Sequence, residues 1–251
     1  MKRAFLSLAM IALFCLSAFG VALAQQTSDV YMEEQVNSPG KDASQPFTGI
    51  IKSWVSGKKL KQELPGTKQS IVFRADLGKV YLLNPAQKIY IEVPIDQMRA
   101  GAQKSLDMYK DESGKIPDTI YKKTGKTKKV GKWNTYEVEL PVEHPSPGAE
   151  TRTTMWVSKE TGFDHEFLVR IFKITMGEKI SPELQKLFDR MTALDGYPVQ
   201  TVKVTTYNNE TYTETSTVLK IERKEKIDQS IFEVPKDFTK AKPPSSPPVT
   251  P

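Results

Sequence analysis

Two residues of a kind that enzymes use for nucleophilic attack, a serine and a lysine, lie three positions apart near residue 56. Ser56 and Lys59 satisfy the Ser-x-x-Lys pattern, in which the serine hydroxyl attacks a carbonyl and the lysine lies beside it. That chemistry needs the serine at the start of a helix. Because Gly57 follows directly in a segment that has the character of a strand turn, we expect no nucleophilic site there.

The histidines offer a second possible chemistry, metal-assisted hydrolysis. His165 and Glu166 begin like a zinc-protease helix, but Val169 stands where the second histidine ligand must be. The other histidine, His144, is remote in sequence. The sequence therefore predicts no catalytic residue, no metal site and no cofactor, and we expect a protein that is not an enzyme.

The N-terminus has the pattern of an export signal. Lys2 and Arg3 precede an apolar run from Ala4 to Leu23, and small residues end the run at Ala24. We expect cleavage after Ala24 and localisation in the periplasm. The single cysteine, Cys15, would leave with residues 1–24, which excludes disulfides, thiolate metal sites and a cysteine nucleophile from the exported chain.

The remainder is expected to form one domain and a tail. Residues 25–240 carry the periodic apolar pattern of a packed domain, whereas residues 241–251 are rich in proline and lack large apolar side chains. We expect a disordered tail over that last range.

The net charge of the whole chain is +6, and one stretch concentrates lysine. One interpretation is a solvated hairpin whose lysines discourage pairing with another strand. The other is a docking patch for an anionic membrane surface or lipid phosphate, which an exported protein meets before any nucleic acid. The lysines are Lys122, Lys123, Lys126, Lys128, Lys129 and Lys132.

Strands dominate the elements that must position these residues. Asn84 and Pro85 suit a type I turn, and after it Ile89, Ile91 and Val93 alternate with polar side chains. Comparable segments follow one another at hairpin spacing, which favours an antiparallel meander. We expect strands at 29–36, 48–64 (two strands), 69–94 (three strands), 128–140, 150–162 and in two further segments flanking Asn208 and Asn209.

Three segments have helical periodicity instead. Residues 95–109 place apolar side chains three and four apart with Asp96 at the start, and residues 164–176 are predominantly apolar. Residues 181–194 have Ser181 as a cap, Pro182 at the first helical position and one apolar stripe.

Four landmarks carry a resemblance to a known group of proteins. They are "GKVYLLNPAQKIYIEVP", "KTKKVGKWNTYEVEL", "TMWVSKETGFD" and "IDQSIFEVPKDF", which span most of the predicted domain. In this order they resemble a group of periplasmic proteins of unknown function that is similar in layout to the outer-membrane lipoprotein carriers of the Lol system.

The resemblance implies an α+β fold: a strongly curved antiparallel sheet, a half-barrel of about ten strands, with helices plugging its concave face. It also implies a non-enzymatic binder or carrier of lipid, acyl chains or another hydrophobic ligand, with lipid or an acylated protein as the partner. Either a bound ligand or the protein's own helices could fill such a face. The alternative is therefore an interaction module of the cell envelope that binds no ligand. The expected concave-face residues are Val80, Leu82, Ile89, Ile91, Val93, Met98, Leu106 and Trp156.

Overall fold

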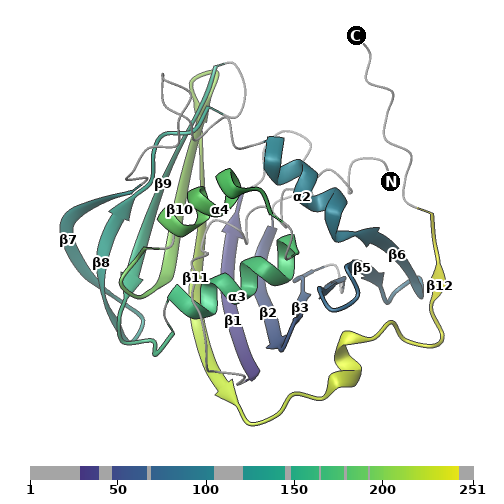
Figure 1. Cartoon of the computed structure of the whole chain (residues 1–251). Coiled ribbons are helices and arrows are strands. Elements are labelled where there is room, and N and C mark those ends of the chain that lie inside the picture. The colour runs from purple at the N-terminus through teal and green to yellow at the C-terminus, as the bar shows by residue number, and fades with distance from the viewer. Residues whose placement is uncertain are drawn as a thin grey trace.

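The computed structural model of the chain describes residues 29–39, 47–66, 69–104, 121–144, 148–163, 165–177, 180–191 and 193–242. Its main feature is one large sheet with helices against it (Figure 1). The predicted signal segment, Cys15, Leu106 and nearly all of the predicted tail lie outside the described residues.

In the described part of the chain, twelve strands form a single open sheet. The strand order is β12-β6-β5-β4-β3-β2-β1-β11-β10-β9-β8-β7, and every pair is antiparallel except β12 with β6. The first half contains β1 (Asp29–Ser38), β2 (Phe47–Ser56), β3 (Lys59–Glu63), β4 (Ser70–Arg74), β5 (Lys79–Asn84) and β6 (Ile89–Pro94). The second half contains β7 (Lys122–Val130), β8 (Trp133–Glu139), β9 (Ala149–Ser158), β10 (Tyr197–Tyr207), β11 (Glu210–Lys224) and β12 (Thr239–Lys240).

The hairpins form where turn residues stand in the sequence. The β5–β6 turn is closed by the Gln87 amide, which donates to the Asn84 carbonyl at 3.3 Å. Asn208 and Asn209 both adopt positive φ, 49° and 65°, as a two-residue hairpin turn that matches strand twist requires. The antiparallel meander predicted from the sequence is confirmed over β1 to β6.

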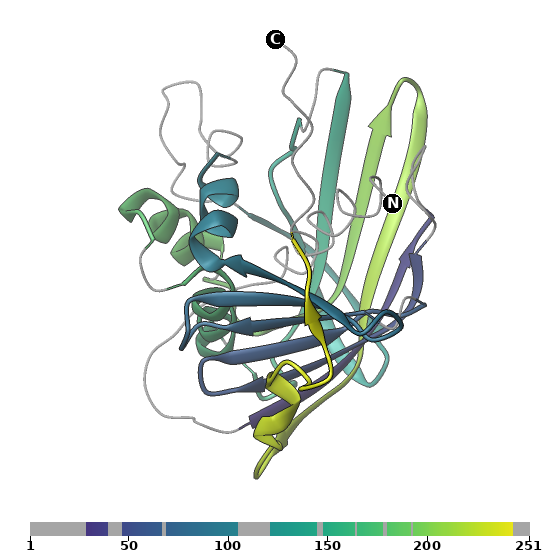
Figure 2. The ribbon, with the colours of Figure 1, turned by 90° about the vertical axis from the view of Figure 1, so that its right-hand side faces the viewer.

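The two halves of the sheet meet at one seam, where β1 pairs with β11. The register shifts there between Glu33 and Glu34, and the β9–β10 ladder shifts between Pro198 and Gln200. Such bulges bend a strand and increase its twist. Figure 2 shows the result: β2 to β5 run across the view while β9 to β11 stand almost upright, so the sheet is curled and open.

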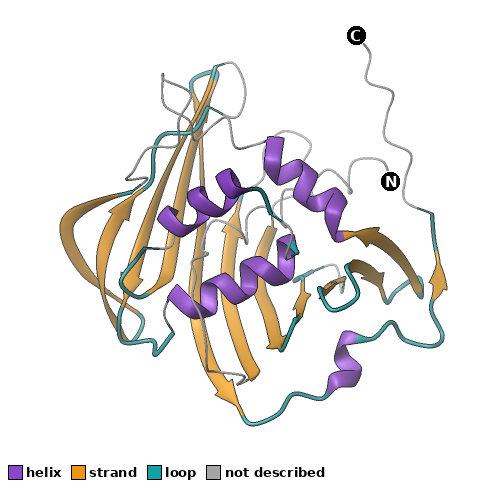
Figure 3. Ribbon diagram, viewed as in Figure 1, coloured by secondary structure: helices purple, strands orange, loops and turns teal. Residues whose placement is uncertain are grey.

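The three described α-helices are α2 (Ile95–Lys104), α3 (His165–Met176) and α4 (Pro182–Met191), drawn in purple in Figure 3. The Ser181 hydroxyl accepts a hydrogen bond from the Leu184 amide at 3.1 Å, which confirms the predicted cap of α4. Asp96 lies within the first turn of α2, not before it, and pairs with Arg99 at 2.6 Å.

The main core lies between α3 and one face of the sheet. Leu168, Ile171 and Ile174 of α3 are buried in one cluster with Val55 of β2 and Phe73 of β4. Helix α4 packs on α3 as well: the rings of Phe172 and Phe188 stack with centroids 3.6 Å apart. At the other end of the sheet a smaller cluster joins Val138, Leu140, Met155, Val157 and Leu194.

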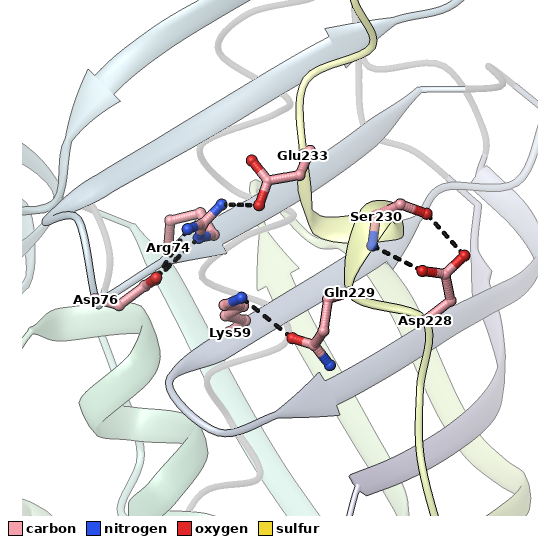
Figure 4. Close-up of polar contacts among 7 residues, drawn as sticks. All are labelled: Lys59, Arg74, Asp76, Asp228, Gln229, Ser230 and Glu233. Atoms are coloured by element: carbon pink, nitrogen blue, oxygen red, sulfur yellow. Dashed lines mark hydrogen bonds and ion pairs between the residues drawn. The ribbon is translucent and has the colours of Figure 1, made fainter.

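The opposite face of β3 to β6 is covered by the C-terminal segment, residues 225–242, which we call the strap (Figure 2). Its short 3-10 helix η3 (Gln229–Phe232) buries Phe232 completely against Val72 and Leu83. Arg74 ties it down, donating to Glu233 at 2.6 Å and to both oxygens of Asp76 (Figure 4). The strap ends as β12 beside β6, where the Ala241 amide donates to the Tyr90 carbonyl at 2.8 Å.

Candidate functional site

The β5–β6 hairpin brings five of the expected concave-face residues together. Val80 lies directly opposite Val93, and Leu82 directly opposite Ile91, so these side chains share the face that carries the main core. Ile89, opposite Asn84, continues the same row. We call the five residues the aliphatic ladder. Val80 and Ile91 are buried, whereas Leu82, Ile89 and Val93 are only partly covered.

Helix α2 begins directly after the ladder and leans on the same cluster. Ile95 is buried in the main core, and Met98, one turn later, is partly buried against it. The predicted ligand-face residue Met98 is therefore beside the ladder.

Trp156 lies far from the ladder within the sheet, on β9. It belongs to the same core cluster as Val80. Because side chains alternate along a strand, it projects from the opposite side of β9 to Met155 and Val157 of the smaller cluster. The Lys128 ammonium lies 4.0 Å from the centroid of its indole ring and donates to Gln200 at 2.6 Å. Desolvation there lowers the pKa of Lys128.

The lysine run forms the free edge of the sheet. All six lysines are exposed, and five belong to β7, which is the last strand of the order. Several are engaged within the molecule: Lys126 pairs with Glu137 at 2.9 Å, and Lys123 and Lys132 lie over Tyr136 and Trp133. Edge position and charge agree with the first interpretation of the run, protection against strand pairing.

Ser56 and Lys59 lie at the strand turn that the sequence predicted, and not at the start of a helix. Ser56 and Lys59 face each other across the tight β2–β3 turn, and Gly57 has φ 55° there. Both contact Gln229 of the strap, whose amide nitrogen donates to the Ser56 hydroxyl at 2.9 Å. Figure 4 shows the other contact, in which Lys59 donates to the Gln229 side-chain oxygen at 3.1 Å. These contacts hold the strap.

The remaining sites give no metal centre in the described residues. Val169 is buried in α3, and the ring of His144 contacts the Ala149 carbonyl at 3.3 Å. Among the described residues no three histidine, cysteine, aspartate or glutamate side chains gather as a metal site. No helix in the described ranges combines the length and apolarity needed to cross a bilayer.

One residue on the ladder's side of the sheet escaped the sequence analysis. Glu34 occupies an inward position of β1, between the buried Met32 and Val36. The Ser216 hydroxyl donates a hydrogen bond to its carboxyl group. Burial raises the pKa of Glu34 from 4.5 to about 7. A charged residue in the apolar register Val30, Met32, Val36 is a signal that the sequence already contained.

Comparison with known proteins finds several solved structures of low similarity. An uncharacterized conserved protein from Thermus thermophilus has a TM-score of 0.45 at 7% identity, covering 94% of this chain and 98% of its own. A Vibrio parahaemolyticus domain, provisionally described as an outer membrane lipoprotein-sorting protein domain, has a TM-score of 0.30 at 11% identity, with 83% and 90% covered. A DUF1329 family protein from Desulfovibrio piger ATCC 29098 has a TM-score of 0.31 at 11% identity, with 92% and 96% covered.

These scores and identities are low, so no function is carried over from those proteins to this chain. No curated protein matches the sequence. A family model does match it, over residues 47–238, which takes in β2 through η3 and therefore both halves of the sheet, the helices and most of the strap. On this match the chain belongs to the family described as Domain of unknown function (DUF4412).

Proposed function

We propose that this domain binds an elongated apolar ligand, such as the acyl chain of a lipid or of an acylated protein, on the concave face of the sheet. It acts in the periplasm and catalyses no reaction on its ligand.

The half-covered end of the aliphatic ladder supports this proposal. Leu82, Val93 and Met98 pack on a core whose inner members are fully buried, yet they retain exposed surface themselves. Burying apolar surface is worth about 25 cal/mol per Å², so such a row favours an apolar partner of matching length. Each methylene of a bound chain would contribute about 0.8 kcal/mol.

The helices on the same side of the sheet compete with the ligand for the apolar face. Helix α3 already buries apolar side chains against β3 and β4. We propose that α2 adapts around the ligand, because Met98 at its ladder end is unbranched and can repack around variable shapes.

The direct test is to purify the protein from an exporting host and to analyse an organic extract by mass spectrometry. We expect lipid or fatty acid in stoichiometric amounts. Leu82→Gln should reduce the amount carried, because it places an amide on the ladder without opening the buried core. Leu77→Gln is the matched control, since Leu77 lies half exposed in the β4–β5 turn.

An extract of the wild type that contains no lipid at stoichiometric sensitivity would refute the proposal. Equal loading of both variants would exclude the ladder as the binding site.

The lysine edge supports a second candidate function, docking on an anionic membrane surface. Six exposed ammonium groups, five on the edge strand β7 and one in the turn after it, would each contribute roughly 1 kcal/mol near such a surface. For the ammonium groups of Lys122 and Lys129 the described residues give no hydrogen bond, ion pair or ring contact, so these two are the best probes.

We expect the wild type to sediment with anionic vesicles at low salt and the double variant Lys122→Gln, Lys129→Gln to sediment markedly less. Lys52→Gln, Lys79→Gln, on the opposite half of the sheet, is the control of equal charge. Equal losses in the two double variants would show that net charge, and not this edge, is responsible.

A further inference from the structure

Glu34 has apolar side chains as its nearest neighbours, although Ser53 and Ser216 are buried polar residues on the same face. Its neighbours on the same face of β1 are Met32 and Val36. On the two paired strands it lies opposite Ile51 of β2 and Val218 of β11. All four neighbours are buried. A carboxyl group placed among them pays for desolvation unless it has a partner.

The partner that the described residues supply is a single hydroxyl group. Ser216 donates to Glu34, while a carboxylate offers acceptor sites for about four donors. The charged residues on the same face of β1, β2, β10 and β11 do not contact it in the described structure. Those residues are Lys203, Glu210, Glu214 and Arg223. Glu214 instead accepts from Ser38 at 2.7 Å, and Arg223 donates to the Gly162 carbonyl at 2.6 Å.

The carboxyl group of Glu34 is desolvated, while the residue as a whole keeps some exposed surface. It also stands at the bulge of the central seam, where Leu219 is the extra residue of β11. Bulges re-aim side chains and are common beside functional sites. Residual acceptor capacity, partial exposure and position together suit a ligand contact.

We propose that Glu34, with Ser216 beside it, binds the head group of an amphiphile whose chain lies on the apolar face, and that this head group is a protonated primary amine. The inference rests on the proposed function. An ammonium group has three donors and no acceptor, which complements a carboxylate. The ionised form of Glu34 would repel an anionic head group.

The distance between β1 and β5 agrees with a ligand that has a long alkyl chain. Strands lie about 4.8 Å apart, so β5 with Leu82 is about 19 Å from β1 when measured along the curled sheet. A head group at Glu34 and a chain end near the aliphatic ladder would therefore belong to a long-chain ligand.

Three probes with one chain and different head groups test this: hexadecylamine, hexadecanol and hexadecanoate, each displacing a fluorescent apolar dye from the full-length exported protein at pH 7. We expect the amine to bind the wild type roughly tenfold more tightly than hexadecanoate, as a charge-assisted hydrogen bond provides. Glu34→Gln should remove that preference and leave hexadecanol within about twofold.

Glu33→Gln is the matched control, because Glu33 is the next residue of β1 and accepts a hydrogen bond from Tyr31 on the other face. It should keep the preference for the amine. Amine binding should also release a proton from the wild type but not from Glu34→Gln, which titrations in buffers of different ionisation enthalpy would report.

The outcomes separate the two proposals. Binding of all three probes with equal affinity, or equal losses in Glu33→Gln and Glu34→Gln, would overturn the head-group assignment and leave the apolar site standing. Failure of every probe to displace the dye would count against the proposed function itself.

Discussion

Glu34 costs the fold free energy when it ionises. Its pKa is about 7 in the folded chain, whereas a solvated glutamate has 4.5. In the interval between these values the unfolded chain has already lost the proton and the folded chain has kept it. Stability therefore falls as pH rises through this interval, by at most about 3 kcal/mol at 1.36 kcal/mol per pKa unit.

We accordingly expect Glu34→Gln to be more stable than the wild type at pH 8, by about 2 kcal/mol, and equally stable at pH 4. Urea unfolding at the two pH values measures the difference. Glu33→Gln should show no such pH-dependent gain. A Glu34→Gln variant that is destabilised equally at both pH values would mean that the carboxyl group has a structural partner and carries no ionisation cost.

The strap is the element that closes the outer face of the first half of the sheet. Its most deeply buried side chain is Phe232, which is fully covered between β4, β5 and the strap itself. The Arg74 guanidinium bound to Asp76 lowers the pKa of that carboxyl and joins Glu233 to the sheet. Apolar anchoring and ion pairing thus act at neighbouring points.

Truncation of the anchor should therefore loosen the strap. We expect Phe232→Ala to lower the free energy of unfolding by about 3–5 kcal/mol, as full removal of a buried phenylalanine does. Ile231→Ala, at the adjacent and only partly buried position, should cost clearly less. The measurement is denaturant unfolding with hydrogen exchange at the Ala241 amide. Similar losses for the two variants would contradict the role of Phe232 as the anchor.

Local elements of the fold could be predicted because their signals are local. The Asn208–Asn209 turn and the Ser181 cap each follow from the backbone preferences of one or two residues. The apolar side of the aliphatic ladder also followed from alternation alone. Trp156 shows the limit: alternation gave it a face of β9, but only the tertiary structure shows what covers that face.

At the scale of the whole molecule, the arrangement depends on contacts that alternation does not encode. β1 pairs with β11, so Val36 lies directly opposite Ser216 although the two residues are separated by most of the sequence of the domain. The strap likewise joins Glu233 to Arg74. Single-sequence patterns report periodicity and not partners, so neither the seam nor the surroundings of Glu34 were predicted.

The pairing of β1 with β11 also affects how the chain folds while it is being synthesised. The innermost strand of the finished sheet, β1, is among the earliest made, yet one of its two flanking strands, β11, is among the last. A nascent polypeptide can therefore assemble β1 to β6 as they emerge, but β1 keeps a bare edge until residue 224 has appeared. During that interval a chaperone that shields unpaired strands would have its most valuable target at the N-terminal strand of this domain.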